Sequence, residues 1–259
     1  MMFASGKLIQ ADWHTTAEGR DMLSCLFTRN KQGLRTFGLL ERPPLSAHIE
    51  EVHYKIFVSG KSGVGKTCTV AKLSGHDIPK SHIETAGIQT STCYWPAKVL
   101  DMNKVMLFRL QFWDAGEAAS KKFDHIMSAC TDRVDAILFL FSITDKVSFD
   151  ELHQQISRLT SSGDNITKLV IATKCDQHAL GEVTRKDIRD FEKTWKIPIL
   201  KVKNILDNNQ SDTNDTVYTM NALCEHLWQR DLILAGKLNK PILLPDSETT
   251  KTITSEEFI

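Results

Sequence analysis

Apolar and polar residues follow two different periods along the middle of the chain. Short apolar runs bounded by turn residues predict strands, and the stretches between most of them repeat apolar residues at helical spacing. The predicted strands cover residues 53–58, 90–100, 105–113, 136–142, 169–173 and 198–202. The predicted helices cover residues 66–75, 118–131, 147–160, 184–195 and 217–231.

The order of these elements predicts an α/β domain. The tight turn at residues 101–103 joins the second and third strands and predicts an antiparallel hairpin. Helices separate the other strands, which is typical of parallel βαβ units. We therefore expect a mostly parallel six-stranded sheet flanked by helices, with any ligand at the carboxyl ends of the strands.

Three regions are expected along the chain: an N-terminal extension over residues 1–50, the α/β domain over 51–235, and a polar tail over 236–259. The tail is predicted to be disordered, and the Asn- and Asp-rich segment 204–215 is predicted to be an exposed loop. In the extension, residues 15–18 fit a helix-capping box with Thr15 as the cap. The apolar residues after it occur at helical spacing and are Met22, Leu23, Leu26 and Phe27. Such a helix could pack on the protein's own core or bind a partner.

Residues 60–67, with the sequence Gly-Lys-Ser-Gly-Val-Gly-Lys-Thr, match the phosphate-loop pattern G-x-x-x-x-G-K-[ST] between a predicted strand and a predicted helix. Glycines let backbone N–H groups surround an anion, and the helix N-terminus adds its positive end. Lys66 is expected to reach the outer phosphates, and the Thr67 hydroxyl to bind Mg²⁺. The residues expected to contact the nucleotide here are Ser62, Gly63, Val64, Gly65, Lys66, Thr67 and Cys68.

The motif Thr173-Lys174-Cys175-Asp176 closes the predicted strand 169–173 and resembles the guanine-binding motif N-K-x-D. Guanine presents two adjacent donors, N1–H and N2–H₂, and the Asp176 carboxylate can accept both. Adenine presents an acceptor at N1, which a carboxylate repels. Lys174 would lay its aliphatic stem across the base. The motif favours GTP or GDP, and a P-loop kinase or ATPase is the weaker alternative.

Two further motifs resemble the switches of small GTPases. Residues 112–117, Phe-Trp-Asp-Ala-Gly-Glu, resemble the second-switch motif W-D-x-A-G-Q-E. The resemblance implies that Asp114 holds the water shell of Mg²⁺ and that the Gly116 N–H contacts the γ-phosphate. Thr85, in the run Glu-Thr-Ala-Gly-Ile at 84–88, resembles the threonine of the first switch. Thr67, Thr85 and Asp114 would then complete an oxygen site for Mg²⁺.

Together these motifs resemble the small GTPases of the Ras superfamily, nearest the Rab branch, and imply the P-loop NTPase small-GTPase fold. The runs at 37–43, 87–90, 94–98 and 121–125 narrow the resemblance to the REM/Rab-like GTPases of the ciliogenesis and planar polarity effector group. That resemblance implies a GTP-binding switch or adaptor in cilium biogenesis and targeted membrane or cargo trafficking at the basal body. It also implies Fuzzy and Inturned as partners.

The chain departs from the family pattern in the second-switch motif and in the base motif. Only Ala115 stands between Asp114 and Gly116, where the family has two residues, and Glu117 follows in place of the catalytic glutamine. Because a carboxylate opposes the charge of the γ-phosphate, we predict slow hydrolysis, with Glu117 the candidate catalytic residue. Thr173 replaces the usual asparagine. An ordinary cycling Rab-like GTPase in vesicle transport remains an alternative.

Composition excludes several classes of partner. Lys and Arg total 32, equal to Asp and Glu at 32, so no basic field indicates nucleic acid. The six cysteines form no C-x-x-C pair, which indicates reduced thiols and a cytoplasmic location. The last cysteine is Cys224, and no N-terminal acylation start is present. We therefore expect no lipid anchor and only an indirect association with membranes.

Overall fold

A computed structural model describes residues 8–20, 49–79, 81, 83–161, 163–204 and 210–238. Within these ranges six strands form one sheet in the order β2-β3-β1-β4-β5-β6. The strands are β1 (Glu50–Ser59), β2 (Ile88–Val99), β3 (Lys104–Ala115), β4 (Ala136–Ser142), β5 (Thr167–Thr173) and β6 (Ile199–Lys201). The β2–β3 pair is antiparallel and the other four pairs are parallel. The predicted fold, including the hairpin, is confirmed.

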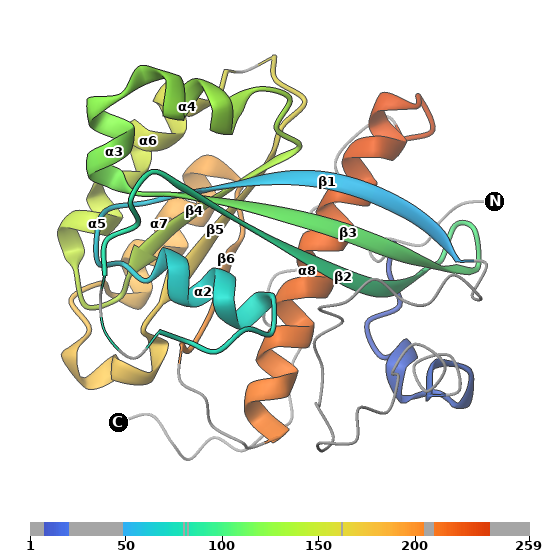
Figure 1. The fold of residues 1–259 in the computed structure, drawn as a ribbon. Helices are drawn as coiled ribbons and strands as arrows, with labels where there is room; N and C mark the ends of the chain where they lie inside the picture. The colour runs from blue at the N-terminus through green and yellow to red at the C-terminus, as the bar shows by residue number, and fades with distance from the viewer. Residues whose placement is uncertain are drawn as a thin grey trace.

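Helices cover both faces of this sheet (Figure 1). They are α2 (Lys66–Leu73), α3 (Glu117–Lys122), α4 (Asp124–Thr131), α5 (Lys146–Asp150), α6 (Leu152–Leu159), α7 (Arg185–Trp195) and α8 (Gln210–Leu234). Two 3₁₀ turns, η1 (Trp13–Thr15) and η2 (Cys175–Leu180), were not expected from the sequence.

The alternation of side chains along the strands divides the core into two clusters. In β1, Ile56 and Val58 join the cluster that contains α2 and α8. Phe57, between them, joins the cluster that contains α4, α5, α6 and α7. All seven residues of β4 are buried, because helices cover both faces of this central strand. Each large apolar side chain buried in this way stabilises the fold by about 1.5–3 kcal/mol.

Two of the predicted helices are interrupted. The helix expected over 118–131 breaks at Phe123, whose backbone is extended (φ −129°, ψ 105°), so α3 ends at Lys122 and α4 begins at Asp124. The helix expected over 147–160 is divided at Glu151 into α5 and α6. Hydrophobic periodicity continues across both breaks, which is why the sequence did not reveal them.

The prediction of an exposed loop over 204–215 is wrong from Gln210 onward, where α8 begins. Extending an existing helix by one residue is much easier than starting one. The buried residues Val217, Met220 and Leu223 anchor α8 in the core. The helix can therefore extend towards its N-terminus through the polar residues that follow Gln210.

The described part of the N-terminal extension packs on the edge of the sheet. Ile9 forms an antiparallel bridge with Val99, and Trp13 is buried at 2% exposure. The Thr16 Oγ1 accepts the Gly19 N–H at 3.0 Å, so the helix cap lies one residue later than the predicted Thr15. The predicted helical residues Met22, Leu23, Leu26 and Phe27 lie outside the described ranges.

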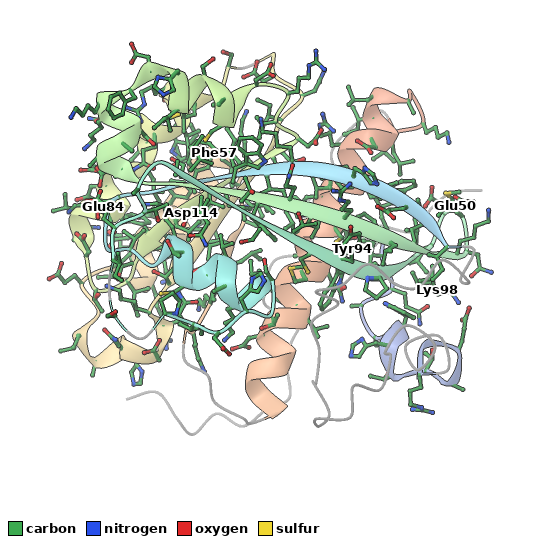
Figure 2. All side chains as sticks on the ribbon, viewed as in Figure 1. Glu50, Phe57, Glu84, Tyr94, Lys98 and Asp114 are labelled. Carbon is green, nitrogen blue, oxygen red and sulfur yellow. The ribbon has the colours of Figure 1, made fainter. Side chains whose placement is uncertain are left out.

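The edge that carries this extension is remote from the carboxyl ends of β1 and β3. Figure 2 shows Lys98, which pairs with Glu18 at 2.5 Å, at one end of the sheet, and Asp114 with Glu84 towards the other. The extension therefore supports the edge of the sheet at a distance from the candidate site.

Candidate functional site

The phosphate-loop sequence forms the turn between β1 and α2. Its Gly65 caps α2 in a left-handed conformation at φ +98°, which glycine adopts without strain. A Cβ at this position would also lie 3.1 Å from the Asn204 Nδ2. The left-handed conformation therefore favours glycine here, and the approach of Asn204 leaves little room for a side chain.

Lys66 lies over this loop and is nearly buried, at 8% exposure. Its Nζ donates to the Gly60 carbonyl at 2.8 Å and to the Lys61 carbonyl at 3.1 Å. Burial lowers the pKa of Lys66, while the neighbouring carboxylates of Asp114 and Glu117 act in the opposite direction. An anion beside the amine would offset its desolvation.

The three residues predicted to bind Mg²⁺ come together. The Thr67 Oγ1 donates to the Asp114 Oδ2 at 2.5 Å, and the Thr85 Oγ1 lies 3.2 Å from the Thr67 Oγ1 and 3.4 Å from the Asp114 Oδ2. Asp114 is buried, and no described residue supplies a hydrogen-bond partner for its Oδ1. An unpaired buried carboxylate oxygen is unfavourable. A hydrated Mg²⁺, which prefers oxygen ligands, fits this donor set.

The two switch segments pack directly against each other. The Gly116 N–H, which the family resemblance assigns to the γ-phosphate, donates to the Gly87 carbonyl at 3.0 Å in this structure. A Cβ on Gly116 would lie 2.0 Å from the Thr85 carbonyl oxygen, so no larger residue fits without movement. In addition, the Ala118 N–H donates to the Glu84 carboxylate at 3.2 Å. Two hydrogen bonds and one close backbone approach therefore join the two switch segments.

The base motif is connected to the phosphate loop through Thr173. This residue is fully buried, and its hydroxyl lies 2.5 Å from the Val64 carbonyl and 3.0 Å from the Phe141 carbonyl. Lys174 then adopts a left-handed conformation at φ +55°, and Asp176 is half-buried in the first turn of η2. The threonine that replaces the family's asparagine thus still ties the base motif to the loop.

Sequence reasoning missed Asn204. Its Nδ2 donates to the Thr69 Oγ1 at 3.0 Å and lies 3.5 Å from the Gly65 carbonyl, which connects the segment after β6 to α2. Nearby, the Lys72 Nζ donates to the Lys203 carbonyl. The only signal for Asn204 was its position just beyond the carboxyl end of the last strand.

Cys68, in the first turn of α2, is half-buried, and burial raises the pKa of its thiol.

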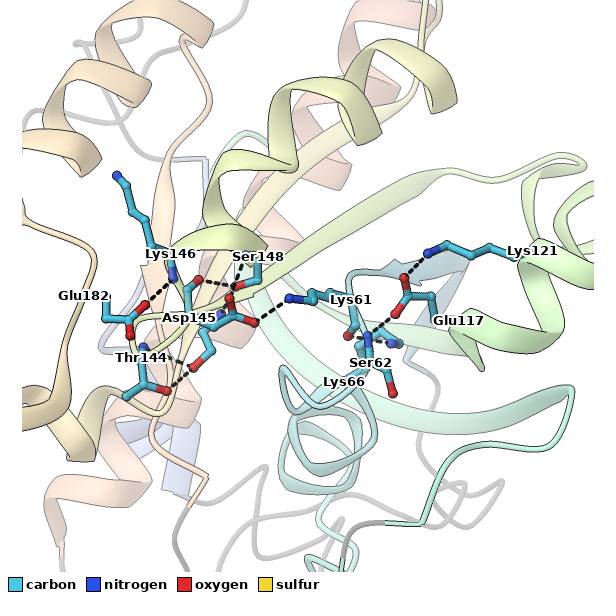
Figure 3. Close-up of polar contacts among 11 residues, drawn as sticks. Lys61, Ser62, Lys66, Glu117, Lys121, Thr144, Asp145, Lys146, Ser148 and Glu182 are labelled. Carbon is cyan, nitrogen blue, oxygen red and sulfur yellow. Dashed lines mark hydrogen bonds and ion pairs between the residues drawn. The ribbon is translucent and has the colours of Figure 1, made fainter.

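Glu117, the candidate catalytic residue, lies against the phosphate loop. Its Oε2 accepts the Ser62 N–H, and its Oε1 accepts the Lys121 Nζ at 2.5 Å (Figure 3). Burial would raise the pKa of Glu117, but the hydrogen bonds from Lys121 and Ser62 prevail and lower it. The side chain also borders a cavity of about 250 Å³ between α3 and α6, which Lys121 and Arg158 line as well.

Two kinds of site are not found in the described part of the chain. No group of three or more His, Cys, Asp and Glu residues there could hold a metal ion. No helix there combines the length and hydropathy needed to cross a membrane.

Comparisons with known proteins agree with this geometry. The model of the Ras family matches residues 55–219. The chain is 44% identical over 244 residues to ciliogenesis and planar polarity effector 2 of Mus musculus, covering 90% of this chain and 94% of that protein. It is 42% identical over 247 residues to the Homo sapiens protein of the same name, with coverage of 91% and 95%. It is 28% identical over 153 residues to the Ras-related protein Rab-26 of Bos taurus, with coverage of 58% and 57%.

Proposed function

The chain belongs to the Ras family of small GTPases, and on that premise we propose that it is a GTP-binding switch or adaptor in cilium biogenesis. Members of this family bind GTP or GDP and usually Mg²⁺. Relatives that match nearly the whole chain are named ciliogenesis and planar polarity effector 2, which supports a cilium-related role within a protein complex.

The observation that carries the proposal is the meeting of Thr67, Thr85 and Asp114 beside the phosphate loop. We assign Mg²⁺ to these three residues and the outer phosphates to Lys66. The remaining phosphate contacts come from the loop, Cys68 and Gly116. Lys174 and Asp176 contact the guanine base, and Thr173 positions them.

The chemistry of Glu117 supports slow hydrolysis. An attacking water must be oriented close to the γ-phosphate, and a glutamine amide can do this as both donor and acceptor. The Glu117 carboxylate can only accept, carries a charge like that of the phosphate, and is already paired with Ser62 and Lys121. Once loaded with GTP, the chain would therefore remain in that state for long periods.

A single-turnover experiment tests this part of the proposal. Purified protein loaded with GTP should convert it to GDP at or below about 10⁻⁴ s⁻¹ without an activating protein. Conversion within seconds would instead support an ordinary cycling Rab-like GTPase.

We also propose that Fuzzy and Inturned are the partners of this protein. It would act in the cytoplasm at the basal body, in targeted membrane or cargo trafficking. Contacts with other proteins would bring it to membranes. The Thr85–Gly116 contact supports a surface whose shape depends on the nucleotide. Immobilised protein loaded with a non-hydrolysable GTP analogue should retain both partners better than protein loaded with GDP. Equal retention in the two states would exclude a nucleotide-dependent adaptor.

A further inference from the structure

Glu117 places a negative charge on a donor that the phosphate loop would otherwise offer to a ligand. Backbone N–H groups of such a loop turn inward to bind an anion, and here the Ser62 N–H is bonded to the Glu117 carboxylate. Lys121 fixes the other carboxylate oxygen at 2.5 Å. The carboxylate is therefore held in place at both of its oxygens (Figure 3).

The carboxylate lies at the end of the loop away from the base motif. Thr173 of the base motif contacts Val64, and Asn204 lies beside Gly65. Glu117 contacts Ser62, near the start of the loop, and follows Gly116, two residues beyond Asp114 of the candidate metal site. A nucleotide with its base at Asp176 would extend its last phosphate towards this end.

The third phosphate of GTP and the Glu117 carboxylate would compete for the Ser62 N–H at this end of the loop. GTP differs from GDP only by the terminal phosphate, which adds negative charge and further acceptor oxygens. Two anions at contact distance repel each other, and the single Ser62 N–H cannot serve both at full strength. GDP lacks the group that would come into conflict with Glu117.

The structure also provides room for the carboxylate to move. α3, which begins with Glu117, has no buried residue, so its displacement disturbs little of the core. The neighbouring cavity of about 250 Å³ is lined by Lys121 and Arg158, whose cationic side chains can pair with the displaced carboxylate.

We propose that Glu117 is a specificity-determining residue that disfavours the triphosphate, because its carboxylate occupies the terminal-phosphate side of the loop and must be displaced when GTP binds. This inference rests on the proposed function. The inference concerns the relative affinity of the protein for GTP and GDP, whereas slow hydrolysis concerns how long bound GTP lasts.

The test is equilibrium binding of GDP and of a non-hydrolysable GTP analogue to the full chain and its variants. Glu117→Gln removes the charge at nearly constant size, and Glu117→Ala removes the whole carboxylate. Both should raise the affinity for the analogue relative to GDP by about tenfold or more, as expected for loss of a charged competitor for one donor. Glu50→Gln, a matched change in another surface Glu–Lys ion pair at the opposite end of the sheet (Figure 2), should leave the ratio unchanged.

An unchanged ratio in both Glu117 variants would overturn the inference, and so would an equal rise in Glu50→Gln, which would indicate a general effect of charge. Neither result touches the proposed function as long as the unmodified protein binds both ligands. If the unmodified chain binds neither guanine nucleotide, the proposed function itself fails.

Discussion

The proposed base end of the site and its proposed terminal-phosphate end are built from different kinds of contact. At the base end, the Thr173 hydroxyl is fully buried and bonded to carbonyl groups of the loop and of β4. At the terminal-phosphate end, Glu117 and Lys121 form a surface ion pair on a helix without a buried residue. Buried hydrogen bonds are hard to replace, whereas surface ion pairs contribute little and exchange readily with water. The base end is therefore suited to fixed selection and the phosphate end to change.

The largest expected effect concerns base selection. If Asp176 selects guanine, Asp176→Asn should shift the preference for GTP over XTP by at least about 1,000-fold, because sites built around hydrogen bonds discriminate strongly. Competition binding with the two nucleotides measures this ratio. If the variant keeps the full preference for GTP, the base must bind elsewhere. The comparison between the base end and the terminal-phosphate end would then have no basis.

The next effect concerns the metal site. Thr67→Asn should lower the affinity for the triphosphate in Mg²⁺ by at least about 100-fold, since even residues that only support a metal ligand change metal affinity by about 10–100-fold. Titration of a fluorescent GTP analogue with Mg²⁺ and with a chelator provides the measurement and its control. The difference should shrink in the chelator, and unchanged affinity in Mg²⁺ contradicts the assignment of this hydroxyl.

A third prediction tests the rigidity of the base end. Thr173→Val keeps the shape of the side chain but leaves the Val64 and Phe141 carbonyls without their hydroxyl donor. It should lower the free energy of unfolding by about 1–3 kcal/mol. Denaturant unfolding of the nucleotide-free protein gives the value, and Thr173→Ser, which keeps the hydroxyl, should lose less. Equal losses in the two variants would mean that the hydroxyl does not stabilise this end.

The smallest effect should come from acidification at the phosphate end. The pKa of Glu117 is lowered in the folded state, so its contacts stabilise the fold fully above the ordinary glutamate pKa of about 4.3. This stabilisation is lost as the pH falls through the lower folded-state pKa. The unfolding free energies of the unmodified protein and Glu117→Gln should differ by less than about 1 kcal/mol at neutral pH, because solvent screens the ion pair. The difference between the two unfolding free energies should shrink on acidification. A difference that grows would contradict a lowered pKa of Glu117 in the folded state.

The fold could be predicted from the sequence because the signals for its elements are local and recur along the chain. All six strands, the hairpin and the position of the phosphate loop follow from apolar runs and glycine spacing. The convergence of Thr67, Thr85 and Asp114 was expected from the resemblance to small GTPases and is seen in the structure.

Other features depend on tertiary contacts that no spacing encodes. The break at Phe123 interrupts a continuous apolar pattern, and Asn204 reaches Thr69 from 135 residues away. The sequence indicated that the charge of Glu117 would oppose a phosphate. Its contact with the Ser62 N–H became visible only when the short second switch was placed beside the loop.

Nucleotide competition tests the central claim most directly. Purified protein carrying fluorescent GDP in Mg²⁺ should release it when challenged with unlabelled GDP or GTP and should retain it when challenged with ATP at the same concentration. Equal displacement by ATP would contradict guanine selection by the Thr173–Asp176 segment. It would favour a P-loop kinase or ATPase over a guanine-nucleotide switch.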